Sequence, residues 1–328
     1  MIPFLLRRLG ASVLLLWLVL TAVFFIAHAT PGDPSSLIED PRMTPALRAN
    51  LRRVYGLDRP LAEQYLRWLG AAARGDWGVS MVQNRPVARV LGEAVPPTFA
   101  LAAAALAIQL VVGFSFGIAG ALRRDRPLDH ALRALSLVFF SLPVFWLSLM
   151  AILLFAVHWP IFPAGGMRSI GAESLPPLER ARDLLAHLAL PASVLGLALS
   201  GFLARYVRGS LLDALSQEHV RMARARGISE RRILGVHALR FALSPVIQVL
   251  ALSIPALLSG SFITEVVFSW PGLGRVGFEA VIGRDYPVIL AITAFTAVLV
   301  IVFNLIADLA HAAIDPRVRD AQAARVAA

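Results

Sequence analysis

Residues Ser216–Pro245, SQEHVRMARARGISERRILGVHALRFALSP, form a charged stretch between two long apolar runs. Eight arginines lie in this stretch and at its margins, from Arg205 to Arg240. The flanking runs, Leu184–Ala204 and Phe241–Thr264, carry no charge, and each is long enough to cross a bilayer. This arrangement predicts a membrane protein in which two spans are joined by a basic loop.

Local signals divide the charged stretch into two short helices. Ser216 can cap the first, with Glu218 in the first turn, where the helix dipole favours an acidic side chain. Gly227 suits the left-handed residue that follows a helix end, and Ser229 can cap a second helix beginning near Glu230. We therefore expect two short helices with a break between them.

The first of these helices has one face of small side chains. Val220, Ala223 and Gly227 follow one another at spacings of three and four, and the neighbouring arginines lie off that stripe. A short helix of this shape, held between two membrane spans, is suited to docking into a groove on another protein. The alternative is an ordinary basic cytoplasmic loop, as expected from the positive-inside rule. Composition alone does not decide between them.

The composition of the whole chain is that of a membrane protein. Of its 328 residues, 58% are hydrophobic and 16% are charged, which is far more apolar than a soluble domain. Six charge-free runs are each about 20 residues or longer, the length that a transmembrane helix needs. The runs are Leu9–Ala29, Thr98–Leu122, Ala134–Met167, Leu184–Ala204, Phe241–Thr264 and Pro287–Ala307. We predict an all-α polytopic membrane protein with six transmembrane helices.

The distribution of charge orients these spans. The N-terminus, the 123–133 loop, the 205–240 loop and the C-terminal tail fall on one side and together hold 17 arginines against 8 acidic residues. The other side holds 14 against 13, and 9 of its arginines lie in one loop too long to count for orientation. Both termini are therefore predicted to be cytoplasmic. Membrane orientation also explains the net charge of +10 better than nucleic-acid binding does.

Three absences exclude classes of chemistry. The chain has no Lys, so it cannot form a Walker A loop, and any ATP hydrolysis must belong to a partner. It has no Cys, which excludes disulfides and thiolate metal sites. Its seven His never fall within four residues of one another, so no local pair suggests a metal site.

The predicted organisation has four parts. They are an N-terminal anchor span (1–29), an extracytoplasmic helical loop (30–97), a five-helix core (98–312) that includes the cytoplasmic loop 205–240, and a cytoplasmic tail (313–328). Ala27-His28-Ala29 fits a signal-peptidase site, but the apolar stretch is longer than a signal core, so we expect an uncleaved anchor. Within the loop, helices are expected after Thr44 and near Pro60. Pro143 is expected to kink the third span.

Several separated motifs resemble those of one transporter family. The pattern of Ala223, Gly227 and an Ile/Leu-rich stretch looks like the EAA loop of ABC importer permeases. RMARARGISERRILGVHALRFALSPV (Arg221–Val246) is similar to the version in the dipeptide/oligopeptide/nickel permease family. The other matching segments are TPGDP (Thr30–Pro34), GLDRPLAEQYLRWL (Gly56–Leu69), RGDWGVS (Arg74–Ser80), SWPGLG (Ser269–Gly274), RDYPV (Arg284–Val288) and DPR (Asp315–Arg317).

Three residues depart from the general EAA pattern. Arg221 and Met222 stand where Glu and Ala are expected, and Arg240 stands where the distal Pro is expected. The peptide-type subfamily looks arginine-rich at these positions, so the departures narrow the match to that subfamily. They leave open which residue takes over the role of the usual glutamate.

The resemblance implies a transport subunit of the prokaryotic inner membrane, without an ATPase site of its own. Its partners would be a homologous second permease subunit in a heterodimer, two ABC ATPase subunits that bind ATP-Mg, and an extracytoplasmic substrate-binding protein. The residues implied in ATPase coupling are Glu218, Arg221, Met222, Ala223, Arg224, Ala225, Arg226 and Gly227. Peptides are the implied substrates, and nickel chelates, glutathione and oligosaccharides are alternatives.

Two further groups of residues are candidates for the transport pathway and its mouth. Gln109 and Glu265 are pathway candidates, although a packing hydrogen bond for Gln109 and interfacial solvation for Glu265 are the simpler explanations. The segment from Trp270 to Gly274 contains two Gly and one Pro, so it cannot form a regular helix. This favours a structural element of the outer mouth of the pathway. Its residues are Trp270, Pro271, Gly272 and Gly274.

Two other functional classes have less support from the sequence. A secondary carrier needs carboxylates near mid-membrane, and the six runs contain none. An intramembrane enzyme would need a motif such as G-x-S-x-G or H-E-x-x-H, and neither occurs in the chain.

Overall fold

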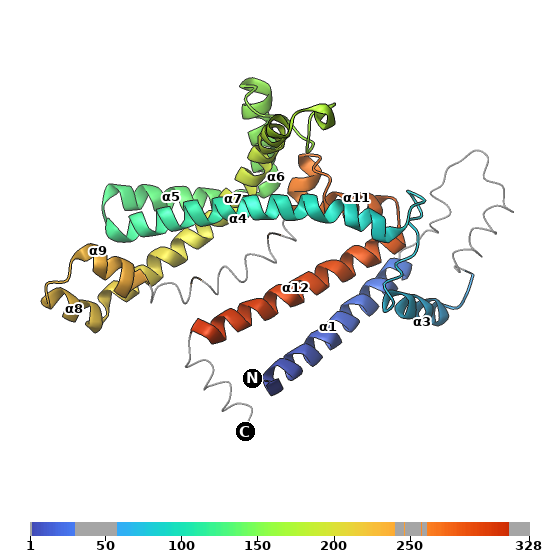
Figure 1. Cartoon of the computed structure of the whole chain (residues 1–328), viewed down its shortest axis with the longest axis horizontal. Helices are drawn as coiled ribbons and strands as arrows, with labels where there is room; N and C mark the ends of the chain where they lie inside the picture. The colour runs from blue at the N-terminus through green and yellow to red at the C-terminus, as the bar shows by residue number, and fades with distance from the viewer. Residues whose placement is uncertain (1, 30–57, 240–245, 247–256, 258–260, 315–328) are drawn as a thin grey trace. The chain divides into compact units, whose positions relative to one another are not determined.

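The computed structural model describes residues 2–29, 58–239, 246, 257 and 261–314, and these are mainly helical (Figure 1). Among them, β-structure is limited to one isolated bridge between Val79 and Pro86. The chain divides into two compact units, residues 1–97 with 272–299 and residues 98–271 with 300–328. Each unit is built around its own apolar clusters.

The first unit joins helices from both ends of the chain. It contains α1 (Ile2–Ala29), α3 (Leu61–Ala72), the first turns of α4 (Val87–Leu122), α11 (Leu273–Ile282) and the N-terminal half of α12 (Tyr286–Ile314), whose remaining turns belong to the second unit. In its core, Val87 and Leu91 of α4 pack with Leu273 of α11 and Val288 of α12. Burial of these side chains holds the start of α4 against the last two helices.

The helix predicted near Pro60 is confirmed as α3, with Pro60 at its N-cap position. It packs on α1 through Tyr65, whose ring centroid lies 5.3 Å from that of Phe24. The Tyr65 hydroxyl lies 2.7 Å from the Thr21 hydroxyl. The helix predicted after Thr44 lies outside the described residues.

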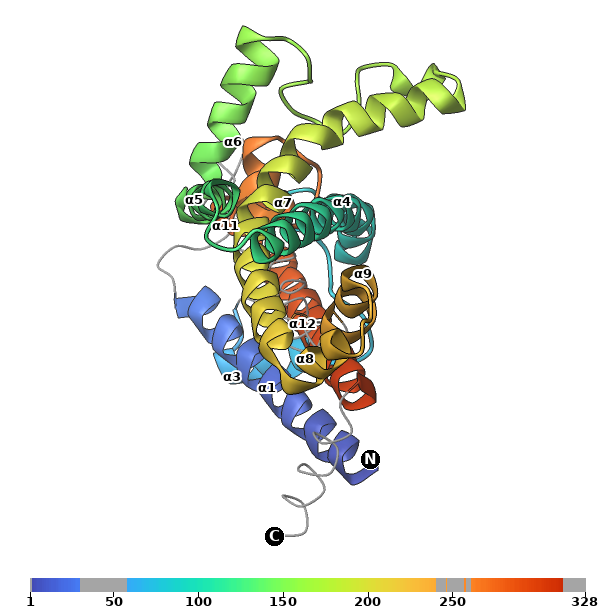
Figure 2. The same ribbon diagram turned by 90° about the vertical axis from the view of Figure 1, so that its left-hand side faces the viewer.

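The second unit contains the remaining helices. They are the rest of α4, α5 (Pro127–Ser141), α6 (Val144–Ile152) with a π-helical turn (Leu153–His158), a 3₁₀ turn (Ala172–Ser174), α7 (Pro177–Ser216), α8 (Glu218–Ala225), α9 (Glu230–Arg232) and a second π-helical turn (Ile233–Ala238). Pro143 does more than kink the third span: α5 ends before it and α6 begins after it. The two halves are bent by 100°, and Figure 2 shows α6 turning away from α5.

Glycines let α4 and α7 pack closely. A Cβ atom on Gly113 of α4 would lie 2.7 Å from the Leu203 side chain, and one on Gly196 of α7 would lie 2.6 Å from the Ala105 carbonyl oxygen. Both distances are too short for a side chain to fit without displacing the neighbouring helix. The Ala- and Gly-rich part of α4 therefore packs tightly against α7.

Two helices begin earlier than the charge-free runs predict. α4 begins at Val87 rather than at Thr98, and α7 begins at Pro177 rather than at Leu184. The extra turns of α4 carry Arg89 and Glu93, which are exposed and form an i,i+4 pair at 3.9 Å. A helix accommodates such pairs readily, so a charge ends an apolar run without ending the helix.

The structure confirms an all-helical protein with several long apolar helices. Within the described residues, α4, α7 and residues 286–306 of α12 are long and apolar enough to cross a membrane, and the bent α5–α6 pair would make a fourth span. The apolar part of α1, Gly10–Ile26, is shorter. The fifth predicted span lies largely outside the described residues, so the count of six stays a prediction.

Candidate functional site

The charged stretch forms a small helical hairpin, α8 to α9, at the end of α7 (Figure 1). Gly227 lies in the left-handed region with φ +73°, as predicted for the break between the two helices. The predicted cap at Ser216 is wrong. Ser216 is the last residue of α7 and its hydroxyl donates to the Asp213 carbonyl oxygen at 2.7 Å, while Gln217 occupies the N-cap position of α8. Ser229 occupies the N-cap position of α9, without a side-chain capping bond.

The small-residue face of α8 is turned toward the protein's own chain. Val220 and Ala223 are buried and form a cluster with Ile233, packed by Leu215 and Ile228. Val220 and Ala223 are thus covered by the chain itself, whereas Gly227 of the same face is exposed. The two buried residues hold the hairpin together, and docking of this short helix on another protein stays a prediction.

The opposite face of α8 is exposed and basic. Met222 is 56% exposed, and Arg221 and Arg226 lie beside it in the sequence and are also exposed. Glu218, Arg224, Ala225 and Gly227, the other residues predicted to act in coupling, are exposed as well. The face therefore presents one flexible apolar side chain among positive charges, a combination suited to an adaptable protein contact.

One arginine of this face is bound within the hairpin. Arg224 donates from Nε and Nη2 to the two carboxylate oxygens of Glu230, at 2.7 and 3.2 Å. The hydrogen bond from Arg224 lowers the pKa of the Glu230 carboxyl below its ordinary value. This pair ties α8 to α9 across the Gly227 break.

Apolar contacts connect the hairpin to the long helices. Leu211 and Ala214 of α7 are buried against Ala121 of α4 and against Ala238 after α9. Leu215 packs both on this cluster and on the cluster beneath α8. The inner face of α8 is thus continuous, through the last turns of α7, with the end of α4.

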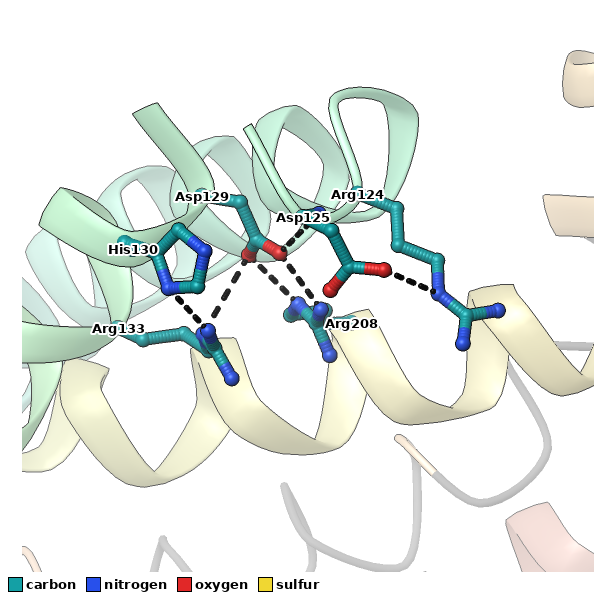
Figure 3. A network of polar contacts seen from close by, with 6 residues as sticks. All are labelled: Arg124, Asp125, Asp129, His130, Arg133 and Arg208. Atoms are coloured by element: carbon teal, nitrogen blue, oxygen red, sulfur yellow. Dashed lines mark hydrogen bonds and ion pairs between the residues drawn. The ribbon is translucent and has the colours of Figure 1, made fainter. Parts of the chain in front are cut away.

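A buried ion pair lies two turns before the end of α7 (Figure 3). Arg208 of α7 donates from Nε to Oδ1 and from Nη2 to Oδ2 of Asp129 in the first turn of α5, both at 2.7 Å. The Asp125 backbone N–H also donates to Oδ2 at 3.0 Å, and the Arg133 Nε atom lies 3.8 Å from Oδ1. The Asp129 side chain is 0% exposed and that of Arg208 is 19% exposed.

The prediction from sequence missed this pair. It treated the 123–133 loop only as a source of positive charge. The available signal was Pro127, which is favoured at the first position of a helix and so places Asp129 in the first turn. Nothing local identifies Arg208, which is 79 residues away in the chain.

The two pathway candidates are both buried in the second unit. Glu265 is 0% exposed and accepts a hydrogen bond of 2.8 Å from the Thr98 hydroxyl, and Gln109 is also 0% exposed. Interfacial solvation therefore does not describe Glu265. The structure does not test whether either residue lines a pathway.

The residues predicted at the outer mouth have different environments. Trp270 is fully buried in an apolar cluster, and its backbone N–H donates to the Glu265 carbonyl oxygen at 2.8 Å. Pro271 is exposed, and Gly272 is buried at the N-cap position of α11. Gly274 is the second residue of α11, so the expectation that the whole motif is non-helical holds only up to Gly272.

A second buried aspartate lies in the first unit. Asp285, just before α12, accepts hydrogen bonds from the Ser80 hydroxyl and from the backbone N–H groups of Met81 and Val82, the latter two at 3.1 and 3.2 Å. Both Asp285 and Ser80 are buried. This carboxylate fastens the loop that precedes α4 onto the turn between α11 and α12.

Comparison with known proteins gives one consistent picture. Residues 109–320 match the family model described as "binding-protein-dependent transport system inner membrane component", and residues 1–102 match the N-terminal model of the same group. The chain is 38% identical over 319 residues to the oligopeptide transport system permease protein AppB of Bacillus subtilis, covering 97% of this chain and 99% of the relative.

Two further relatives and one solved structure extend the comparison. The dipeptide transport system permease protein DppB of Escherichia coli K12 is 34% identical over 97% of this chain and 99% of its own length. The glutathione transport system permease protein GsiC of Salmonella paratyphi A is 35% identical over the same shares. A chain from the inward-facing MetNI methionine ABC transporter is 19% identical, with a TM-score of 0.56, over 69% of this chain and 96% of that one. At that identity the likeness shows the fold alone.

Proposed function

Because the chain belongs to the binding-protein-dependent transport system inner membrane components, we propose that it forms half of the translocation pathway of an ATP-driven importer of di- and oligopeptides. The relatives named for oligopeptide and dipeptide transport match it over nearly their whole length, which supports this substrate class. The protein is a transport component of the bacterial inner membrane rather than an enzyme.

The proposed topology has six spans, with both termini and the α8–α9 hairpin in the cytoplasm. The long apolar helices support the spans, and the arginine-rich loops support the orientation. The loop 30–97 would then face the substrate-binding protein or cover the spans. α3 and its packing on α1 make at least part of that loop a folded element.

The observation that supports the mechanism is that only one face of α8 is buried. Its inner face is packed on the chain's own helices, and Met222 with its neighbouring arginines remains outside. This outer face would bind an ATPase subunit, with Met222 in an apolar pocket and acidic groups facing Arg221 and Arg226. Movement of the ATPase pair would then press on α8 and be carried into the spans.

ATP binding and hydrolysis are assigned to the partner subunits. The chain has no Lys and so cannot supply the phosphate-binding lysine of a Walker A loop. Two ATPase subunits would bind ATP-Mg, and a homologous second permease subunit would complete the pathway as a heterodimer. The transport cycle would be alternating access, with the two permease subunits rocking about a central site.

One comparison favours glutathione as an alternative substrate. The relative named for glutathione transport is as similar to this chain as the dipeptide permease is. Nickel chelates and oligosaccharides stay alternatives that the resemblance allows. Selection is expected to lie mainly in the binding protein.

Reconstitution of the whole assembly tests the proposal. We expect uptake into proteoliposomes to require ATP, both ATPases, both permeases and the loaded binding protein. A thermal-shift screen of the cognate binding protein against di- and oligopeptides, glutathione and nickel chelates would identify the substrate class. Uptake that continues without the ATPases, driven by an ion gradient, would contradict the proposal and favour a secondary carrier.

A further inference from the structure

One buried carboxylate gathers three helices at the end of the second unit that carries α8. Asp129 of α5 binds Arg208 of α7 through both of its oxygens, each at 2.7 Å. The backbone N–H of Asp125, in the turn after α4, donates to the same carboxylate. Gly120 of α4 leaves the room that the pair needs, because a Cβ atom there would lie 3.1 Å from Asp129 Oδ1. The ends of α4, α5 and α7 therefore meet at one ion pair.

The geometry of this pair fixes orientation as well as distance. Two parallel N–H···O bonds between a guanidinium and a carboxylate allow neither group to rotate without losing one of them. The carboxylate is fully buried, so water does not compete for its lone pairs. The pair thereby fixes the orientation in which α7 meets α5 at this level.

The same end of α7 carries the hairpin. The buried residues of α8, Val220 and Ala223, pack on Leu215, and Leu215 also packs on the cluster that contains Leu211. Leu211 lies one turn after Arg208 on α7. A displacement of α8 is therefore transmitted to α7 within two turns of the ion pair.

We propose that the Asp129–Arg208 pair positions α7 against α4 and α5, so that a movement of α8 shifts the three helices as one body. This inference rests on the proposed function, because it assumes that an ATPase moves α8. Asp129 and Arg208 are positioning residues, and they act on transport through the hairpin. Without the pair, α7 would move alone and ATP hydrolysis would be uncoupled from the membrane-spanning helices.

The test needs a variant that removes the pair without leaving a buried charge alone. The double variant Asp129→Asn, Arg208→Met retains an oxygen for the Asp125 N–H and fills the volume of the arginine stem. Replacing both partners of a buried pair is often close to neutral for stability, whereas removing one is not. Asp125→Asn is a matched control, because the Asp125 side chain is exposed and its contact with Arg124 lies in the same turn.

The measurement is the ratio of binding-protein-stimulated to basal ATP hydrolysis by the reconstituted four-subunit complex. The probe is the cognate binding protein, purified with the ligand it acquires during growth on peptone. We expect the ratio to fall roughly tenfold in the double variant, within the usual range of coupling between two sites. Assembly and basal hydrolysis should be retained, and the Asp125→Asn complex should behave like wild type. Loss of stability alone would lower the yield of complex but not this ratio.

A wild-type ratio in an assembled double variant would overturn this inference and leave the proposed function intact. If wild-type complex itself shows no stimulation, the proposed function fails and the inference fails with it. If the double variant does not assemble, Gly120→Ala replaces it, with Gly209→Ala as control because a Cβ at Gly209 meets open space. A lower ratio for Gly120→Ala alone supports the inference, and equal ratios for the two variants overturn it.

Discussion

The two compact units each contain a buried aspartate, and the two carboxylates are satisfied in different ways. Asp129 in the second unit binds a guanidinium, and the bond joins two helices that are far apart in the chain. Asp285 in the first unit binds a hydroxyl and two backbone N–H groups of a single loop. The carboxylate with neutral donors fixes the shape of one loop and fastens it to the turn before α12, whereas the carboxylate with a cationic fork fixes one helix against another.

This difference matches the proposed roles of the two regions. We place the loop held by Asp285 at the extracytoplasmic face of the membrane, where it needs a defined shape. The helices held by Asp129 must transmit movement from α8 without slipping past one another. Predictions that compare the two sites therefore test the account more sharply than either site alone.

The largest effect is expected for Asp129→Ala. This variant leaves the Arg208 charge partly buried without its partner, which should lower the free energy of unfolding by about 3–5 kcal/mol. Thermal unfolding of the purified complex in detergent measures the change. A loss below about 1 kcal/mol, the value of a surface pair, would show that water replaces Asp129 easily.

A smaller effect is expected for Asp285→Ala. Its three donors would lose their acceptor, and neutral donors cost less than a cation, so the expected loss is about 1–3 kcal/mol. Hydrogen exchange should accelerate at the amides of Met81 and Val82, whose N–H groups bind Asp285. Asp76→Ala is the control, because its carboxylate accepts an exposed N–H from Gly78. If Asp285→Ala proved more damaging than Asp129→Ala, the contrast between the two sites would be wrong.

The smallest effect on stability is expected for Glu230→Gln in the hairpin. Arg224 lowers the pKa of Glu230 in the folded state, so the pair stabilises the fold above the ordinary carboxyl pKa. That contribution is lost as the pH falls through the lowered value. Because the pair is exposed, the melting temperatures of wild type and variant should differ little at neutral pH and converge in acid. A difference that grows as the pH falls would contradict this assignment.

Gly227→Arg separates coupling from stability in the same hairpin. A Cβ at Gly227 meets open space, but φ +73° disfavours any side chain by about 1–2 kcal/mol. We expect normal assembly with impaired stimulation of ATP hydrolysis, because α8 would be displaced from its α9 support. Gly209→Ala is again the neutral control. Unchanged stimulation in Gly227→Arg would remove the hairpin from the coupling mechanism.

Local patterns predicted much of the fold. The break at Gly227 and the interruption at Pro143 both follow from residues that restrict the backbone, and the structure contains them. The start of α4 was misplaced because a charged residue ends an apolar run, whereas an exposed i,i+4 pair does not end a helix.

The site was predicted less completely, for two physical reasons. The small face of α8 was interpreted as suited to docking on a partner, and its burial against Ile233 of the same hairpin, through Val220 and Ala223, was not foreseen. Helical periodicity shows that a face is apolar but not what covers it. The Asp129–Arg208 pair depends on two helices meeting in space, which spacing along the chain does not indicate.

The central claim is that the outer face of α8 binds an ATPase subunit. A photo-crosslinking amino acid at Met222, which is 56% exposed, tests it directly in the complete assembly. The account predicts a crosslink from position 222 to an ATPase, and none to an ATPase from the exposed Gln83 in the first unit. The account is contradicted if position 222 gives no such crosslink in an active complex, or if reagents confined to the outside of intact cells label it.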